Sequence, residues 1–108
     1  MQATDTIQRY ERILATSSQM VLAAEESRWD ELIDMEIARR ELILEATSLS
    51  TAPLADEKLQ LHKETLIRGI LAADERVKAL TATWMKEMEG ILSSVQAERK
   101  LARAYESR

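Results

Sequence analysis

The sequence predicts an all-α protein, and three observations lead to this prediction. Glycine occurs twice and proline once in 108 residues, whereas a β-rich domain needs many turn-forming residues. Ala, Leu, Glu, Arg and Met, which favour helices, are abundant. Apolar residues recur at steps of three and four, the spacing of one face of a helix. The length fits a single domain, residues 1–108.

The first helix is expected from about residue 4 to residue 24, with Thr4 or Asp5 as its N-terminal cap. The second is expected from about residue 28 to residue 47, with Ser27 as its cap. Only Glu25-Glu26-Ser27 separates the two segments. A connection this short predicts that they pack as an antiparallel hairpin. The apolar face expected on the first helix comprises Ile7, Tyr10, Leu14, Ser17, Val21 and Ala24.

The third helix is expected from about residue 56 to residue 92, after a break at residues 48–53. Pro53 disfavours helical geometry in the residue before it, and Asp56 or the residues just before it can start this helix. Residues 95–108 have a helical composition and are expected to form a short, mobile fourth helix. The predicted fold is an antiparallel helical hairpin plus one long third helix, with a short C-terminal fourth helix, in an up-down bundle.

The third helix is expected to outrun the hairpin, because it would span about 55 Å against about 30 Å for each of the other two. It would pair with the hairpin to about Arg76. Large apolar residues continue beyond that point, and each one left in water forgoes about 1.5–3 kcal/mol of burial. Such a surface usually marks an interface. The residues expected to contact a partner are Val77, Leu80, Trp84, Met85, Met88, Ile91 and Leu92.

Glu36 and Arg40 project into the apolar arc of the second helix on a helical wheel. The acid precedes the base by four residues, which suits an intrahelical ion pair. Two interpretations stay open. The pair is either a partly exposed one of little energetic weight, or a polar element that meets a polar group on a partner.

Catalytic, metal and cofactor sites are not indicated. There is no Cys, and His62 is the single histidine, without ligand-type residues at suitable spacing. A phosphotransfer histidine is usually followed shortly by Lys and Gly, whereas residues 63–66 read Lys-Glu-Thr-Leu. We therefore predict a protein that is not an enzyme and needs no cofactor.

The charge and hydropathy favour a cytoplasmic protein that binds other proteins. A formal net charge of −4 disfavours nucleic acid as a partner, because phosphate binding requires a basic face. The longest apolar runs are far shorter than the ~18 residues of a membrane-spanning helix, so no membrane insertion is expected. The N-terminus has no secretory signal pattern, and the absence of Cys is compatible with a reducing compartment.

Short motifs at both ends of the chain match a known family pattern. They are Tyr-Glu-Arg-Ile-Leu at 10–14, Trp-Asp-Glu-Leu at 29–32 with Glu36 and Arg39-Arg40 after it, then Leu-Ser-Ser at 92–94, Arg-Lys-Leu at 99–101 and Ala104-Tyr105. In this order they resemble the FliT family, the flagellar export chaperones of the filament-cap protein. The resemblance covers nearly the whole chain, and chaperones of the hook-filament junction proteins share much of the pattern.

The resemblance implies a cytoplasmic chaperone that binds the C-terminal helical segment of the filament-cap protein. It would prevent premature self-association of that segment and deliver it to the type III export apparatus. Further implied partners are the export ATPase complex, the export gate and, in some bacteria, a flagellar transcription regulator. The resemblance also implies that a mobile C-terminal segment modulates access of partners, with Tyr105 at the position linked to docking on the gate.

Two other interpretations remain open at this stage. The near-heptad spacing of the third helix also suits a structural homodimer whose long helices pair as a coiled coil, so the chain is either a monomer or a homodimer. A histidine phosphotransfer module based on His62 is the other alternative. The tail could also cover the apolar surface until a partner displaces it.

Overall fold

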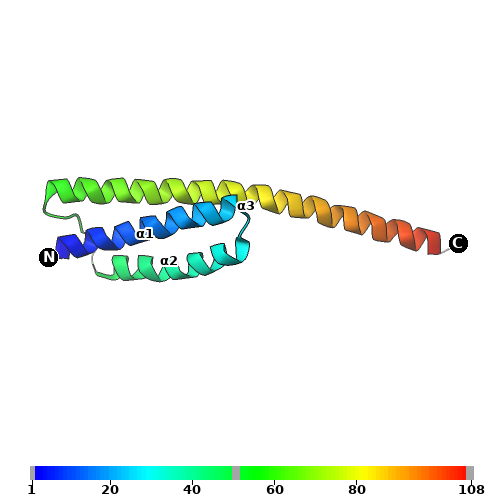
Figure 1. The fold of residues 1–108 in the computed structure, drawn as a ribbon, viewed down its shortest axis with the longest axis horizontal. Coiled ribbons are helices and arrows are strands. Elements are labelled where there is room, and N and C mark those ends of the chain that lie inside the picture. The colour runs from blue at the N-terminus through cyan, green and yellow to red at the C-terminus, as the bar shows by residue number, and fades with distance from the viewer. Residues whose placement is uncertain (1, 50–51, 107–108) are drawn as a thin grey trace. The chain divides into compact units, whose positions relative to one another are not determined.

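The computed structural model describes residues 2–49 and 52–106. Within these residues it contains three helices, α1 (Gln2–Glu25), α2 (Trp29–Leu49) and α3 (Glu57–Glu106), which confirms the all-α class (Figure 1). The chain divides into two units after Lys78. The first, Met1–Lys78, is a bundle of α1, α2 and the first part of α3. The second, Ala79–Arg108, is called the C-terminal segment below.

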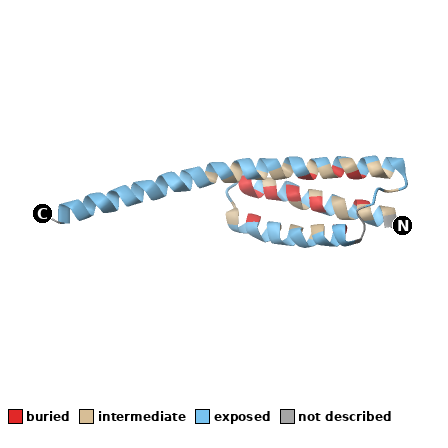
Figure 2. Ribbon diagram, turned by 180° about the vertical axis from the view of Figure 1, so that it is seen from behind, coloured by how far each residue is buried: buried red, intermediate tan, exposed pale blue. Residues whose placement is uncertain are grey.

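The central helix of the bundle is α1, and both α2 and α3 pack on it (Figure 1). Most of the buried side chains therefore lie along α1 (Figure 2). Ile13 and Met20, which the predicted apolar face left out, are each only 2% exposed. Because α1 packs against both α2 and α3, its buried residues extend beyond a single apolar stripe. The buried residues of α1 are Ile7, Ile13, Ser17, Met20, Ala23 and Ala24.

The turn between α1 and α2 is built on Ser27, whose φ is 59°. The N–H of Ser27 donates to the carbonyl of Ala24 (3.2 Å), and the N–H of Arg28 donates to that of Ala23 (2.8 Å). This pair of hydrogen bonds defines a Schellman motif, which satisfies free carbonyls at a helix C-terminus. Ser27 thus ends α1, and the prediction that it caps the second helix is wrong.

The N-terminus of α2 is organised by Arg28. Its carbonyl accepts the first helical hydrogen bond, from the N–H of Leu32 (3.0 Å). Its guanidinium donates to Glu31 and to Glu26, the latter at 2.7 Å. The hydrogen bond to Glu31 raises the pKa of Arg28 above its ordinary value, and the charge of Glu26 raises it further. This cluster connects Glu26 in the interhelical turn to Glu31 at the start of α2. Interactions between neighbouring residues therefore set the direction in which α2 leaves the turn.

The N-terminus of α3 is capped by Asp56, the residue at which the sequence predicts the helix to start. The carboxylate of Asp56 accepts the N–H groups of Lys58 (2.9 Å) and Leu59 (3.3 Å), which would otherwise lack partners. The side chain of Gln60 accepts the N–H of Leu54 (2.8 Å) and so ties the preceding loop to the helix. The part of the predicted break at residues 50–51 lies outside the described residues.

Close packing of α3 on α1 depends on Gly69. A Cβ atom at this position would lie 3.1 Å from Cδ1 of Leu14, closer than an ordinary contact. At the far end of α1, Arg76 Nε lies 3.7 Å from Glu25 Oε1. The third helix therefore pairs with α1 to about Arg76, as the relative lengths predict.

The prediction of a separate fourth helix is wrong for the described residues. Residues 95–106 continue α3 without a break, and the side chains from Met85 to Glu106 are exposed. Ser93-Ser94 is followed closely by strong helix formers at residues 96–100, and no Gly or Pro occurs between Ile91 and Glu106. Two serines cost too little helix propensity to end a helix in that context.

None of the described helices is both long enough and apolar enough to cross a membrane.

Candidate protein-binding site

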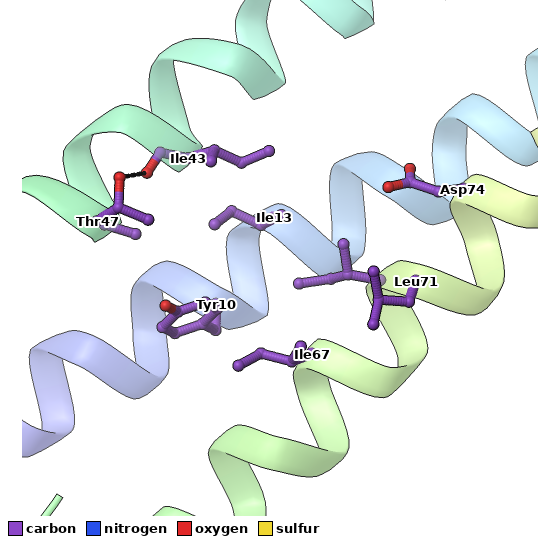
Figure 3. Close-up of a pocket in the computed structure, with 9 residues that line it drawn as sticks. Tyr10, Ile13, Ile43, Thr47, Ile67, Leu71 and Asp74 are labelled. Carbon is purple, nitrogen blue, oxygen red and sulfur yellow. Dashed lines mark hydrogen bonds between the residues drawn. The ribbon is translucent and has the colours of Figure 1, made fainter. Parts of the chain in front are cut away.

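An apolar groove opens on the bundle between α2 and α3, with α1 behind it (Figure 3). Its volume is about 280 Å³. The groove forms because α2 and α3 both pack on α1, so their facing side chains leave space between them. Two lining residues come from α1, three from α2 and four from α3, and together these are Tyr10, Ile13, Ile43, Ala46, Thr47, Ile67, Ile70, Leu71 and Asp74.

One end of the groove is closed by a polar network that joins all three helices. The guanidinium of Arg39 pairs with the carboxylate of Asp74 and donates to the hydroxyl of Ser17 at 3.1 Å. Ser17, which is 1% exposed, in turn donates to the carbonyl of Ile13 at 2.7 Å. The side chain of Arg39 is 14% exposed and that of Asp74 is 32% exposed. A largely covered ion pair with further hydrogen bonds sets the spacing of α2 and α3 at this point.

The outer face of α2 carries a second apolar surface. Ile33, Ile37 and Leu44 are 54%, 53% and 63% exposed, although Leu32 and Ala46 on the same helix are buried against the bundle. A helix with apolar residues on more than one face is usually covered on more than one face. In the bundle only one face of α2 is covered, which leaves the other available to a partner.

The predicted pair Glu36–Arg40 lies beside this surface. Arg40 Nη2 donates to Glu36 Oε1 at 3.1 Å, and the two side chains are 68% and 52% exposed, respectively. Together with Arg39, Ile43 and Leu44 they line a small hollow on α2. An exposed pair of this kind contributes little to folding, typically about 0.5 kcal/mol or less.

The other predicted contact residues belong to α3. Val77 is half-buried in the bundle. In the C-terminal segment Leu80 and Trp84 are half-buried, whereas Met85, Met88, Ile91 and Leu92 are between 40% and 57% exposed. Exposed apolar residues continue to the end of the described helix with Leu101 and Tyr105, at 63% and 68%. The C-terminal segment thus carries apolar side chains along its whole described length.

None of the residues that line the groove is among the residues predicted from the sequence to contact a partner. Ile67 and Leu71 of α3 are four residues apart, which places both on one side of the helix. The sequence signal for the groove was this row of apolar residues on α3. Whether such a row lines a groove or is covered depends on the distance between α2 and α3.

His62 has an ordinary surface environment. Its Nε2 atom lies 3.5 Å from Oε1 of Glu11, and both side chains are about half exposed, at 48% and 52%. Among residues 2–49 and 52–106, no group of three or more His, Asp or Glu side chains is arranged to hold a metal ion.

Comparison with known proteins identifies the family. The sequence profile described as "Flagellar protein FliT" matches residues 7–107, nearly the whole chain. The chain belongs to the FliT family of flagellar proteins. The resemblance found in the short motifs is thereby confirmed, and so is the prediction that the protein is not an enzyme.

Individual FliT relatives align over most of their length. A protein named flagellar protein FliT from Photorhabdus laumondii is 27% identical over 101 residues, which cover 94% of this chain and 81% of the relative. The FliT proteins of Enterobacter sp. strain 638 and Yersinia pseudotuberculosis are 23% and 22% identical, over 93% and 92% of this chain and 82% of each relative. Bundle and C-terminal segment both fall within the aligned region.

Proposed function

We propose that this FliT-family protein is a cytoplasmic flagellar export chaperone for the filament-cap protein. It binds the C-terminal helical segment of that protein, prevents its premature self-association and delivers it to the type III export apparatus. The observation that carries the proposal is the apolar groove between α2 and α3, which continues onto the exposed apolar face of α2.

A groove walled by two helices suits an amphipathic helix. Such a helix inserts apolar side chains at positions i, i+3, i+4 and i+7 and keeps its polar face in water. Six of the nine lining residues of the groove are aliphatic, and Tyr10, Thr47 and Asp74 are the members with polar groups. Cap-protein segments that assemble through apolar helical faces would be kept apart while one such face is held here.

The C-terminal segment supplies a second contact surface in this proposal. Met85 and Met88 have flexible side chains that adapt to different partners, and Ile91 and Leu92 extend their surface. The proposed contact set also includes Val77, Leu80, Trp84 and the exposed Glu36–Arg40 pair. Tyr105, which is 68% exposed, is proposed to dock on the export gate. Further proposed partners are the export ATPase complex and a flagellar transcription regulator.

The proposal is tested by titrating the intact chain with the C-terminal helical segment of the filament-cap protein and measuring the dissociation constant. Leu71→Asp places a charge in the groove at a side chain that is 58% exposed, so the fold should tolerate it. We expect the dissociation constant to rise at least about tenfold, which corresponds to about 1.4 kcal/mol.

The matched control is Leu22→Asp, which makes the same change at a 45% exposed leucine on α1 that lines no part of the groove. The control variant should bind the segment like the wild type. Equal weakening by both variants would remove the groove from the proposal. A chain that binds no cap segment and forms a stable dimer would support the alternative of a structural homodimer.

A further inference from the structure

Lys63 is a charged residue in a covered position. It is 6% exposed, which is unusual for a lysine unless its ammonium group has a partner. The Nζ atom lies 5.6 Å from the centroid of the Tyr10 ring, within the range of a cation–π interaction. An aromatic face attracts a cation but does not neutralise its charge, so an anionic partner would still gain from binding here.

No carboxylate among the described residues forms an ion pair with Lys63. The two acids adjacent in sequence to the Lys63–Tyr10 pair have other partners. Glu11, next to Tyr10, lies 3.5 Å from His62. Glu64, next to Lys63, accepts a hydrogen bond from Gln60 at 3.4 Å. The bundle therefore covers most of the Lys63 side chain and supplies no counter-charge for its ammonium group, which keeps some access to solvent.

The position of Lys63 relates it to the groove. Tyr10 is one of the lining residues, and Lys63 precedes the lining residue Ile67 by about one helical turn of α3. Asp74 lies at the other end of the lined part of α3, where its charge is already matched by Arg39. The charge of Asp74 at one end of the groove is thus matched, whereas Lys63, which lies next to the lining residue Tyr10 but is not itself a lining residue, has no carboxylate partner.

We infer that the groove accepts an amphipathic helix whose apolar row is followed by a carboxylate, and that Lys63 binds this carboxylate. The inference rests on the proposed chaperone function and deepens it, because it names the chemistry by which a cargo helix is selected. The apolar residues of the groove bind the row, and Lys63 sets where the row must end. A carboxylate forms a charge-assisted hydrogen bond with an ammonium group, which is roughly twice as strong as a hydrogen bond between neutral groups, so a carboxylate is preferred to its neutral amide.

The test uses the intact chain and a designed helical peptide with blocked ends. The peptide carries apolar residues at i, i+3, i+4 and i+7 and one Glu a turn beyond the row at each end, so that either orientation offers a carboxylate. A twin peptide has Gln at both positions. Dissociation constants are measured for the wild type, Lys63→Met, Lys63→Arg and Lys58→Met. The last variant removes an exposed lysine near the start of the same helix.

We expect the wild type and Lys58→Met to bind the Glu peptide about tenfold more tightly than the Gln twin. Lys63→Met should bind both peptides equally, and Lys63→Arg should restore the preference because it restores the charge. A urea unfolding curve of each variant checks that the bundle is intact. Equal binding of the two peptides by the wild type, or no binding of either, would overturn the inference.

A parallel titration with the cap-protein segment separates this inference from the proposed function. If the cap segment binds but the wild type shows no preference for Glu, the role of Lys63 is wrong and the chaperone function stands. If the preference for Glu is present but the cap segment does not bind, the selectivity of the groove stands and the cargo is a different helix.

Discussion

Arg39 joins three helices through one side chain, whereas its neighbour Arg40 contacts only its own helix. Arg39 bonds to Asp74 of α3 and Ser17 of α1 and is 14% exposed. Arg40 bonds to Glu36 and is 68% exposed. Arg39 is thus largely covered and Arg40 is exposed. Substituting each in turn therefore measures how much the network of Arg39 contributes to the stability of the bundle, with Arg40 as the control.

We predict that Arg39→Met lowers the free energy of unfolding by about 1–3 kcal/mol, because Asp74 then keeps a partly covered charge without its partner. Arg40→Met should change it by no more than about 0.5 kcal/mol, as expected for an exposed pair. Urea unfolding followed by circular dichroism measures both values. Equal effects of the two substitutions would show that the network does not stabilise the bundle.

Local sequence signals predicted some of these residue-level features and missed others. The start of α3 near Asp56 was recognisable because it depends on Pro53 and on residues close to Asp56 in sequence. Ser27 was assigned to the wrong helix, because a serine between two helices can either cap the second or adopt a left-handed conformation that ends the first. The network of Arg39 and the burial of Lys63 depend on residues far away in sequence, so no local pattern indicates them.

At the level of the element, the two glycines of α3 have different surroundings. A Cβ at Gly69 would lie 3.1 Å from Leu14, whereas a Cβ at Gly90 would have no heavy atom within 4 Å. Glycine has a low helix propensity, so by propensity alone it weakens the helix equally at both positions. The structure gives a packing reason for the first glycine and shows open space around the second.

We predict that Gly90→Ala stabilises the helix around it by up to about 1 kcal/mol, because alanine has the higher helix propensity and meets no obstacle. Gly69→Ala should gain less or lose stability, because Leu14 must shift to admit the new methyl group. Ellipticity at 222 nm during thermal unfolding measures both changes. A larger gain from Gly69→Ala would contradict the close approach of α3 to α1.

The exposed row of the C-terminal segment makes a prediction about binding. Met88→Asp should weaken binding of the cap-protein segment about tenfold or more and leave the helical ellipticity nearly unchanged, because Met88 is 40% exposed. Trp84→Ala should act in the same direction. Ser93→Asp adds the same charge as Met88→Asp but about 140° around the helix, and it should have little effect. Loss of helical structure in Met88→Asp would instead make Met88 a packing residue.

The end of α3 was the least predictable element. Composition identified residues 95–106 as helical, but it did not distinguish a new helix from the continuation of the old one. That distinction depends on whether a turn forms at Ser93-Ser94. The surrounding residues favour helix strongly enough that the two serines are accommodated within it.

At the scale of the whole molecule, the buried side chains of the described residues all lie in the bundle, whereas exposed apolar side chains occur both there and in the C-terminal segment. The buried residues run from Ile7 to Ile70, within the bundle. We predict that removing residues 95–108 changes the free energy of unfolding of the bundle by less than about 0.5 kcal/mol, since no buried side chain is lost. Urea unfolding checks this. A clearly lower midpoint for the truncated chain would mean that the removed segment contributes to the core.

The helical hairpin, the long third helix and its pairing to about Arg76 all followed from spacing and length, which are properties of the sequence. The groove did not follow from them. Its existence depends on α1 lying between α2 and α3, and three amphipathic helices of these lengths could also pack in mutual contact. The network of Arg39, Asp74 and Ser17 is the part of the sequence that selects the spacing seen here.

The measurement that tests the central claim most directly is light scattering after size exclusion, with and without an equimolar C-terminal helical peptide of a filament-cap protein. The account predicts that the peak containing the 12.3 kDa chain gains the mass of one peptide per chain. A stable homodimer whose mass does not change when the peptide is added would contradict it, because the apolar surfaces would then be covered by a second copy of the chain.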